Sequence, residues 1–203
     1  MIISIISQGL FWSILGLGIF MTFRILNFPD MTTEGSFPLG GAVAVTLITK
    51  GVNPLIATLI AILAGCLAGF ATGDNPDMAS SFGINTGRME LMGLVLSNGV
   101  IALAGALIAQ QEGYADASRG IGVIVIGLAS LIIGEVLFKS LTLAERLMTI
   151  VVGAIAYQFL IWAVIALGFN TSYLRLYSAV ILAICLMIPT LKNKFFKGVT
   201  LSK

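Results

Sequence analysis

Polar side chains gather in one short stretch of an otherwise apolar chain, NFPDMTTEGSF at residues 27–37. A proline breaks a helix there, and Thr33 can cap a new helix that begins at Glu34. Unwound backbone at membrane depth is tolerated only where it is buried or lines a cavity, and broken helices in transporters direct their amino termini at anionic substrate groups. The stretch therefore predicts a substrate-facing or gating element, with a simple surface loop as the alternative. Its candidate residues are Pro29, Asp30, Thr32, Thr33, Glu34 and Ser36.

Four further polar residues stand alone inside apolar runs, namely Asn98, Gln110, Glu135 and Gln158. An ionisable or polar group inside a membrane span is a functional candidate by default. Glu135 lies four residues before Lys139, and an ion pair at that spacing on a helix accounts for it without a functional role. Asn98, within LSNGV, falls in mid-helix, where it faces either a cavity or a hydrogen-bonding partner on a neighbouring helix. We add Asn98 to the candidates for a substrate pathway.

The other residue types exclude several kinds of chemistry. The chain has no histidine, which removes the commonest metal ligand and general base and makes a Ser-His-Asp triad impossible. Cys66 and Cys185 lie in apolar runs and are expected to be small buried side chains rather than a disulfide or a metal site. No phosphate-binding loop of the form GxxxxGK followed by Ser or Thr occurs, so we expect no ATP hydrolysis by this chain. A non-catalytic protein without metal or cofactor is predicted.

The composition indicates a protein that spans a membrane several times. Of the 203 residues, 58% are hydrophobic and 10% are charged, and the mean hydropathy is +1.06, whereas soluble domains average about 45–50% apolar and about 25% charged residues. A net charge of +2 is too small to indicate a nucleic-acid partner. The predicted fold class is all-α, a polytopic transmembrane helix bundle that forms one domain over residues 1–203 and contacts membrane lipid.

Apolar segments of about 20 residues, the length that crosses a bilayer, recur along the chain. Lysines in the tail KNKFFKGVTLSK place it inside, which puts the loop Lys139–Arg146 inside and the loop QEGYADASRG outside. The side of the N-terminus stays open. Gly65, Gly69 and Gly73 recur on one helix face, either for packing within the bundle or for a dimer seam. The expected spans are 7–26, 54–72, 92–110, 121–138, 147–169 and 173–191, with a marginal or re-entrant helix at 34–49.

A second polar stretch, GDNPDMASSFGINTGR at residues 73–88, falls on the inner side in this topology. Its first residues suit a helix cap and a first turn, and a glycine ten residues on can end the helix. Met78 and Phe82 then lie on one apolar face. An ordinary capped loop between spans is the alternative, but it does not explain an exposed apolar face, which favours a partner.

The runs DNPDMASSFGIN, MGLVLSNGVIALAGALIAQQEGYAD, GIGVIVIGLASLIIGE and FRILNFPDMTTEGSFPLGGAVA together resemble the membrane permease subunits of bacterial ABC importers. The resemblance covers nearly the whole chain and is to the branched-chain amino-acid permease-like family, within it to members that accompany tryptophan/tyrosine-type substrate-binding proteins. In that family the capped segment is the coupling helix, which sits in a groove of a separate ATPase subunit. The residues that the resemblance assigns to ATPase docking are Asp74, Asn75, Pro76, Asp77, Met78, Ala79, Ser80, Ser81, Phe82, Gly83, Ile84 and Asn85.

The resemblance also implies a function and an assembly. The chain would be a multi-pass protein of the bacterial plasma membrane that moves a small solute, an amino acid by preference, by ATP-driven alternating access. Its partners would be an ABC ATPase subunit, an extracytoplasmic substrate-binding protein and a second permease chain in a homodimer.

The sequence departs from the family at one point. AGCLAGFATGDNPDM runs directly from an early span into the coupling helix, where family members place further spans. We expect an internal stretch to be absent, with a deletion joint near residues 71–74. The alternative function is therefore a transport-defective membrane interaction or regulatory protein that only docks the ATPase.

Overall fold

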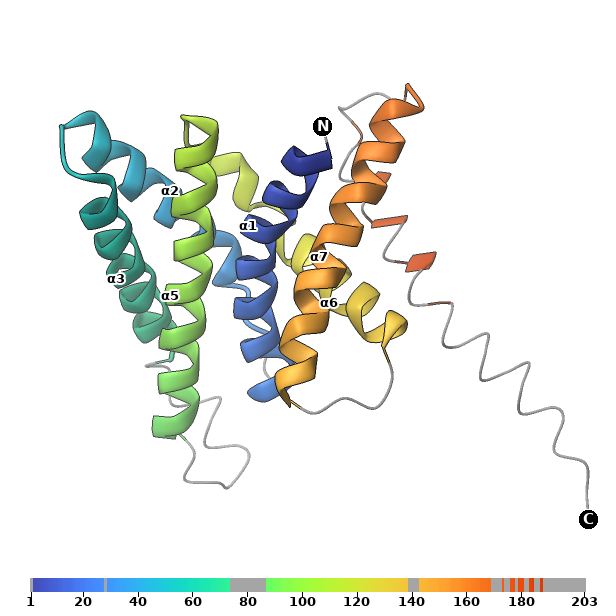
Figure 1. The fold of residues 1–203 in the computed structure, drawn as a ribbon. Coiled ribbons are helices and arrows are strands. Elements are labelled where there is room, and N and C mark those ends of the chain that lie inside the picture. Colours follow the sequence, from blue (N-terminus) through green and yellow to red (C-terminus); the bar gives the residue numbers. More distant parts are fainter. Residues whose placement is uncertain are drawn as a thin grey trace, which may run out of the picture.

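The computed structural model describes residues 2–27, 29–73, 87–138 and 143–168, together with isolated positions between 173 and 187. The predicted docking helix at 74–85 and most of the predicted last span lie outside these residues. Within the described ranges the chain is helical and has no strand (Figure 1). The elements are α1 (Ile2–Phe20), the π-helical turn η1 (Met21–Ile25), α2 (Thr33–Thr49), α3 (Pro54–Gly73), α5 (Gly87–Glu112), the 3-10 helix η3 (Ala117–Gly120), α6 (Val123–Leu137) and α7 (Leu143–Ala166).

Five described segments are long and apolar enough to cross a membrane. They include η1 as a continuation of α1, and η3 and α6 as one broken span. The predicted all-α polytopic bundle is confirmed, as are the five spans expected from hydropathy before residue 169. The segments are Ile2–Ile25, Pro54–Ala71, Glu90–Glu112, Ala117–Val136 and Glu145–Ala166.

The core of the bundle forms around α1, which packs against α5, α6 and α7. Leu15 and Ile19 of α1 are fully buried with Ile101 of α5 and Val123 of α6. Toward the outside of the bundle, α3 presents a row of large apolar side chains that are exposed in the isolated chain. Membrane-spanning helices require such an apolar exterior, because lipid replaces water around them.

The glycine row on α3 packs inside the bundle. A Cβ atom built at Gly65 would lie 2.5 Å from the carbonyl oxygen of Asn98, and one built at Gly69 would lie 2.5 Å from that of Leu94. Both distances are far shorter than a carbon–oxygen contact, so only glycine lets the backbones of α3 and α5 come this close. Of the two expectations for this row, packing within one bundle is confirmed.

The marginal helix predicted at 34–49 is α2, 17 residues long. At 1.5 Å per residue it reaches about 25 Å, less than the hydrocarbon core of a bilayer. Its first turn lies beside the middle of α5, where Ser36 contacts Asn98, and its last turn leads to the start of α3. In Figure 1 the start of α1 lies at the same end as the ends of α5 and α7. With the loop before α7 predicted inside, α1 therefore begins outside.

Candidate functional site

A cluster of fully buried polar side chains lies where the first turn of α2 meets the middle of α5. We call Asp30, Thr33, Ser36 and Asn98 the polar cluster. Asp30 and Thr33 come from the chain that enters α2, Ser36 follows one turn later, and Asn98 projects from α5. The sequence predicted all of these residues as candidates individually, and the structure brings them together.

Asn98 is the hub of the polar cluster. Its side-chain Nδ2 donates to Asp30 Oδ2 at 2.7 Å and to the carbonyl oxygen of Leu94 at 3.0 Å. Its Oδ1 accepts from the hydroxyl of Ser36 at 2.6 Å. Both amide protons and the carbonyl oxygen are therefore bonded. Of the two expectations for Asn98, a hydrogen bond to a neighbouring element is the one that the structure shows.

Asp30 precedes α2 and accepts hydrogen bonds from the first residues of that helix and its cap. Its Oδ1 accepts from the backbone N–H of Thr32 at 2.8 Å, and its backbone carbonyl accepts from the hydroxyl of Thr33 at 3.0 Å. The prediction that Thr33 caps a helix beginning at Glu34 is therefore wrong, because the helix begins at Thr33 and the acceptor at its start is Asp30. An aspartate accepts readily from the N–H two residues ahead, which gives it an advantage over a threonine one position inside the helix.

The carboxylate of Asp30 sits in this site without a basic partner among the described residues. The two ion pairs in those ranges are Arg24–Glu135 and Arg119–Glu112. A buried carboxylate is costly in an apolar interior unless hydrogen bonds or dipoles compensate it. Here two neutral donors and the positive end of α2 do so. The arrangement leaves Asp30 suited to receive a cationic group.

Glu34, in the first turn of α2, forms a hydrogen bond at the start of another helix, α6. Its Oε1 accepts from the backbone N–H of Gly122 at 2.9 Å, directly before α6. Gly122 has φ of 82°, a left-handed conformation that glycine adopts without strain. The starts of α2 and α6 are thus both occupied by carboxylates of the protein itself. The expectation that such helix ends are directed at an anionic group of a ligand is therefore not met in this conformation.

Pro29 and Thr32 complete the set predicted from the first polar stretch. The Thr32 backbone takes part in the turn with Asp30, whereas Pro29 is exposed. Sequence reasoning missed Ser97, which is fully buried beside Asn98 and whose hydroxyl has no hydrogen-bond partner in the described structure. The serine directly preceding Asn98 in LSNGV was the available signal.

The end of α5 that is predicted to lie outside carries a small cavity of about 20 Å³, room for roughly one water molecule. Beside it, Arg119 of η3 pairs with Glu112 and donates to the hydroxyl of Tyr114 at 2.7 Å. Phe37 of α2 lines the same cavity and stacks on Trp12, with ring centroids 5.6 Å apart. At this end the ion pair therefore joins η3 to α5, and the stacked rings join α2 to α1.

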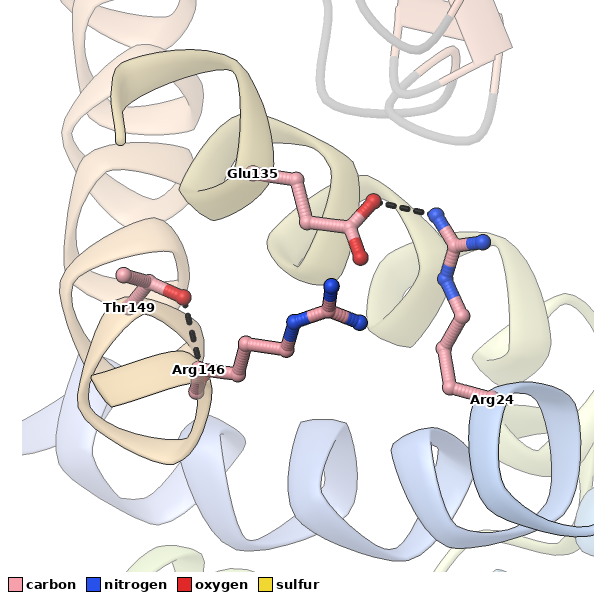
Figure 2. A network of polar contacts seen from close by, with 4 residues as sticks. All are labelled: Arg24, Glu135, Arg146 and Thr149. Carbon is pink, nitrogen blue, oxygen red and sulfur yellow. Dashed lines mark hydrogen bonds and ion pairs between the residues drawn. The ribbon is translucent and has the colours of Figure 1, made fainter. Parts of the chain in front are cut away.

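The end predicted to lie inside carries the other ion pair, between Arg24 of η1 and Glu135 of α6 (Figure 2). The expected partner of Glu135 was Lys139, which lies outside the described residues. Arg24, 111 positions away in the sequence, is the partner that the structure shows. Glu135 thus connects two spans.

Comparison with known proteins assigns the chain to a family. Residues 70–189 match the family described as branched-chain amino acid transport system / permease component. A tyrosine transport system permease protein of Clostridioides difficile is 31% identical over 261 aligned positions, which cover 89% of this chain and 88% of the relative. An autoinducer 2 import system permease protein of Salmonella typhimurium is 31% identical over 47% of this chain and 28% of its own length. No solved structure matches the chain significantly.

The aligned length has a consequence for the chain's architecture. Because 261 aligned positions exceed the 203 residues of this chain, the alignment contains stretches of the relative that have no counterpart here. The family match begins at residue 70, close to the predicted joint at 71–74.

The family match covers more than half of the chain, and the described helices have the length and composition of membrane spans. The chain is therefore a multi-pass protein of the cell membrane that belongs to the branched-chain amino acid transport permease family.

Proposed function

We propose that the chain is the membrane-spanning subunit of an ABC uptake transporter and moves an amino acid by ATP-driven alternating access. The observation that carries this proposal is the similarity to a tyrosine transport permease over 88% of that relative's length. A separate ATPase would dock on residues 74–85, an extracytoplasmic binding protein would deliver the solute, and two copies of the chain would form the pore.

The polar cluster supports an amino acid as the solute. An α-amino acid carries an ammonium group, and Asp30 is a buried carboxylate bonded only to neutral donors in the described structure. Ser36 and Asn98 beside it are neutral groups that can exchange hydrogen bonds with a ligand. All of these residues are fully buried, so the path through the cluster is closed in this conformation and must open for passage.

A second candidate function is a membrane protein that docks the ATPase but does not transport. The alignment favours it, because positions of the relative have no counterpart in this chain. If those positions form spans that line the pore, the remaining helices keep the coupling segment and lose the path.

Reconstitution in lipid vesicles with the cognate ATPase and binding protein separates the two functions. For a transporter, we expect the loaded binding protein to stimulate ATP turnover and the vesicles to accumulate labelled solute. Phe82→Ala, in the predicted docking segment, should lower both signals. Copurification of the ATPase without stimulation or accumulation would replace the first function with the second.

A further inference from the structure

One carboxylate and two guanidinium groups lie near one another at the predicted inner ends of three spans. Figure 2 shows Glu135 of α6 between Arg24 of η1 and Arg146 of α7, with both guanidinium groups pointing toward it. Glu135 pairs with Arg24. Arg146 takes part in neither of the two ion pairs that the described residues form. Glu135 therefore has two arginines nearby and forms an ion pair with one of them, Arg24.

The pair with Arg24 is placed so that it can break. Its side chains keep 48% and 28% of their surface exposed, so water can solvate both groups when they separate. Ion pairs with this much exposure contribute little net free energy, because water screens the two charges. Arg24 also stands on η1, a π-helical turn, and such turns occur often at functional positions in helices.

The helices that carry Glu135 and Arg146, α6 and α7, are packed closely against each other. A Cβ atom built at Gly134 would lie 2.3 Å from the carbonyl oxygen of Thr149, and one built at Gly153 would lie 2.0 Å from that of Ser130. The backbones of α6 and α7 are therefore in direct contact around Glu135 and Arg146. Close-packed helices of this kind move together more readily than they separate.

The contact between α1 and α6 is of a different kind. At Gly127 of α6 the nearest atoms are the side chain of Ile19, not its backbone. Nearer the start of α1, a Cβ atom at Gly9 would lie 2.8 Å from the Cα of Ile155 in α7. The outer half of α1 is thus fixed to α7 by backbone contact. Its inner end is held by side chains, with Phe20 against Leu131 of α6 and Ile150 of α7, and by the Arg24 ion pair to α6.

We propose that Glu135 is a two-position switch that exchanges Arg24 for Arg146 when the inner ends of α1 and α6 separate. The proposal rests on the transport function, since it describes how the inner side of the path opens. The Arg24 pair holds the inner end closed. The Arg146 pair receives the carboxylate once α1 has moved, so that no carboxylate is left unpaired at the membrane boundary. Arg24 and Arg146 therefore stabilise opposite states.

The test measures the distance between the inner ends of α1 and α6 directly. Spin labels at Ile25→Cys and Phe138→Cys, two exposed positions, report that distance in lipid nanodiscs by pulsed electron paramagnetic resonance. Cys66→Ser and Cys185→Ser remove the native thiols. We expect a short and a long distance, with Arg24→Gln raising the proportion of the long one and Arg146→Gln lowering it. Each change should alter the ratio of the two populations about two- to fivefold, the size that one partly exposed ion pair supports.

Further variants make the result specific. In a Glu135→Gln background, Arg146→Gln should have no effect on the ratio, because its partner is gone. Arg24→Lys and Arg146→Lys, which keep the charge, should stay close to the parent protein. A shift in the same direction for Arg24→Gln and Arg146→Gln, or no shift for Arg146→Gln, would overturn the switch. Because the distances need neither ATPase nor solute, a chain that switches but fails in reconstitution loses only the transport proposal.

Discussion

At the scale of single residues, the polar cluster depends on Asn98 more than on any other side chain. The Asn98 side chain joins two residues to α5: its Nδ2 donates to Asp30, and its Oδ1 accepts from Ser36. Neither partner has water available, since both are fully buried. Each buried group that loses its partner costs about 1–3 kcal/mol. The amide therefore fixes the start of α2 against α5 in addition to any role in the path.

Asn98→Ala should lower the free energy of unfolding by about 2–4 kcal/mol, because two buried polar groups lose their partner and a small cavity forms. Its neighbour provides the control. Ser97 is equally buried, but its hydroxyl has no partner in the described structure, so Ser97→Ala should be neutral or slightly stabilising. Reversible denaturation in mixed micelles measures both variants. Equal losses for the two would contradict the hub position of Asn98.

Residue types in the sequence identified the candidate polar side chains, but they did not predict which of these side chains hydrogen-bond to each other. Asp30, Ser36 and Asn98 were each predicted because polar groups in apolar runs are rare. Their bonds join positions 62 and 68 residues apart, and no local pattern carries that information. Glu135 shows the same limit: the spacing to Lys139 is visible in the sequence, whereas the pair with Arg24 depends on how α1 and α6 pack.

At the scale of elements, close backbone contacts at glycine fix the position of α2. Pro38 lies inside it and has no N–H, so the carbonyl of Glu34 lacks its usual helical donor. A Cβ atom at Gly120 would lie 2.0 Å from that same oxygen, which shows how closely η3 approaches. On another side, Gly40 places α2 in backbone contact with α5. The helix is therefore held between η3 and α5 at the level of the polar cluster.

Gly40→Ala should destabilise the protein by about 1–3 kcal/mol, because its Cβ would lie 2.1 Å from the carbonyl oxygen of Ala102 and α2 would have to move away. Gly35→Ala in the same helix is the matched control. Nothing lies within 4 Å of a Cβ atom there, so the change should be neutral or stabilise by up to about 1 kcal/mol through helix propensity. Thermal unfolding in detergent reports both variants, and a loss at Gly35 as large as at Gly40 would argue against close packing as the cause.

Hydropathy predicted the spans well because lipid imposes one simple requirement, about 20 apolar residues in a row. The boundaries of α3 and α5 extend the expected spans 54–72 and 92–110 by a few residues. The expected span 121–138 corresponds to α6, Val123–Leu137, and the left-handed Gly122 directly precedes that helix. The predicted loop before it contains the short 3-10 helix η3, which hydropathy does not detect.

At the scale of the whole molecule, the helices on either side of the predicted joint pack directly on each other. Gly65 and Gly69 of α3 bring its backbone against α5, although the alignment leaves positions of the relative without a counterpart. The two helices that flank the predicted joint therefore share a packed interface. A loss of transport through missing spans would not require a loss of fold, and the two must be measured separately.

The placement of the helix ends predicts the topology of the whole chain. Single cysteines at Ile3, Tyr114 and Phe138, all exposed positions, are introduced into a protein whose native cysteines are replaced by serine. Ile3 and Tyr114 lie toward the predicted outer side and Phe138 beside the inner ion pair. A membrane-impermeant maleimide added to intact cells should label the thiols at positions 3 and 114 and spare the one at 138. Permeabilised cells control for reactivity, since all three thiols should then react. Labelling of position 138 in intact cells, with positions 3 and 114 spared, would invert the bundle in the membrane and place the Arg24–Glu135–Arg146 group at the outer end, where it could not face the ATPase.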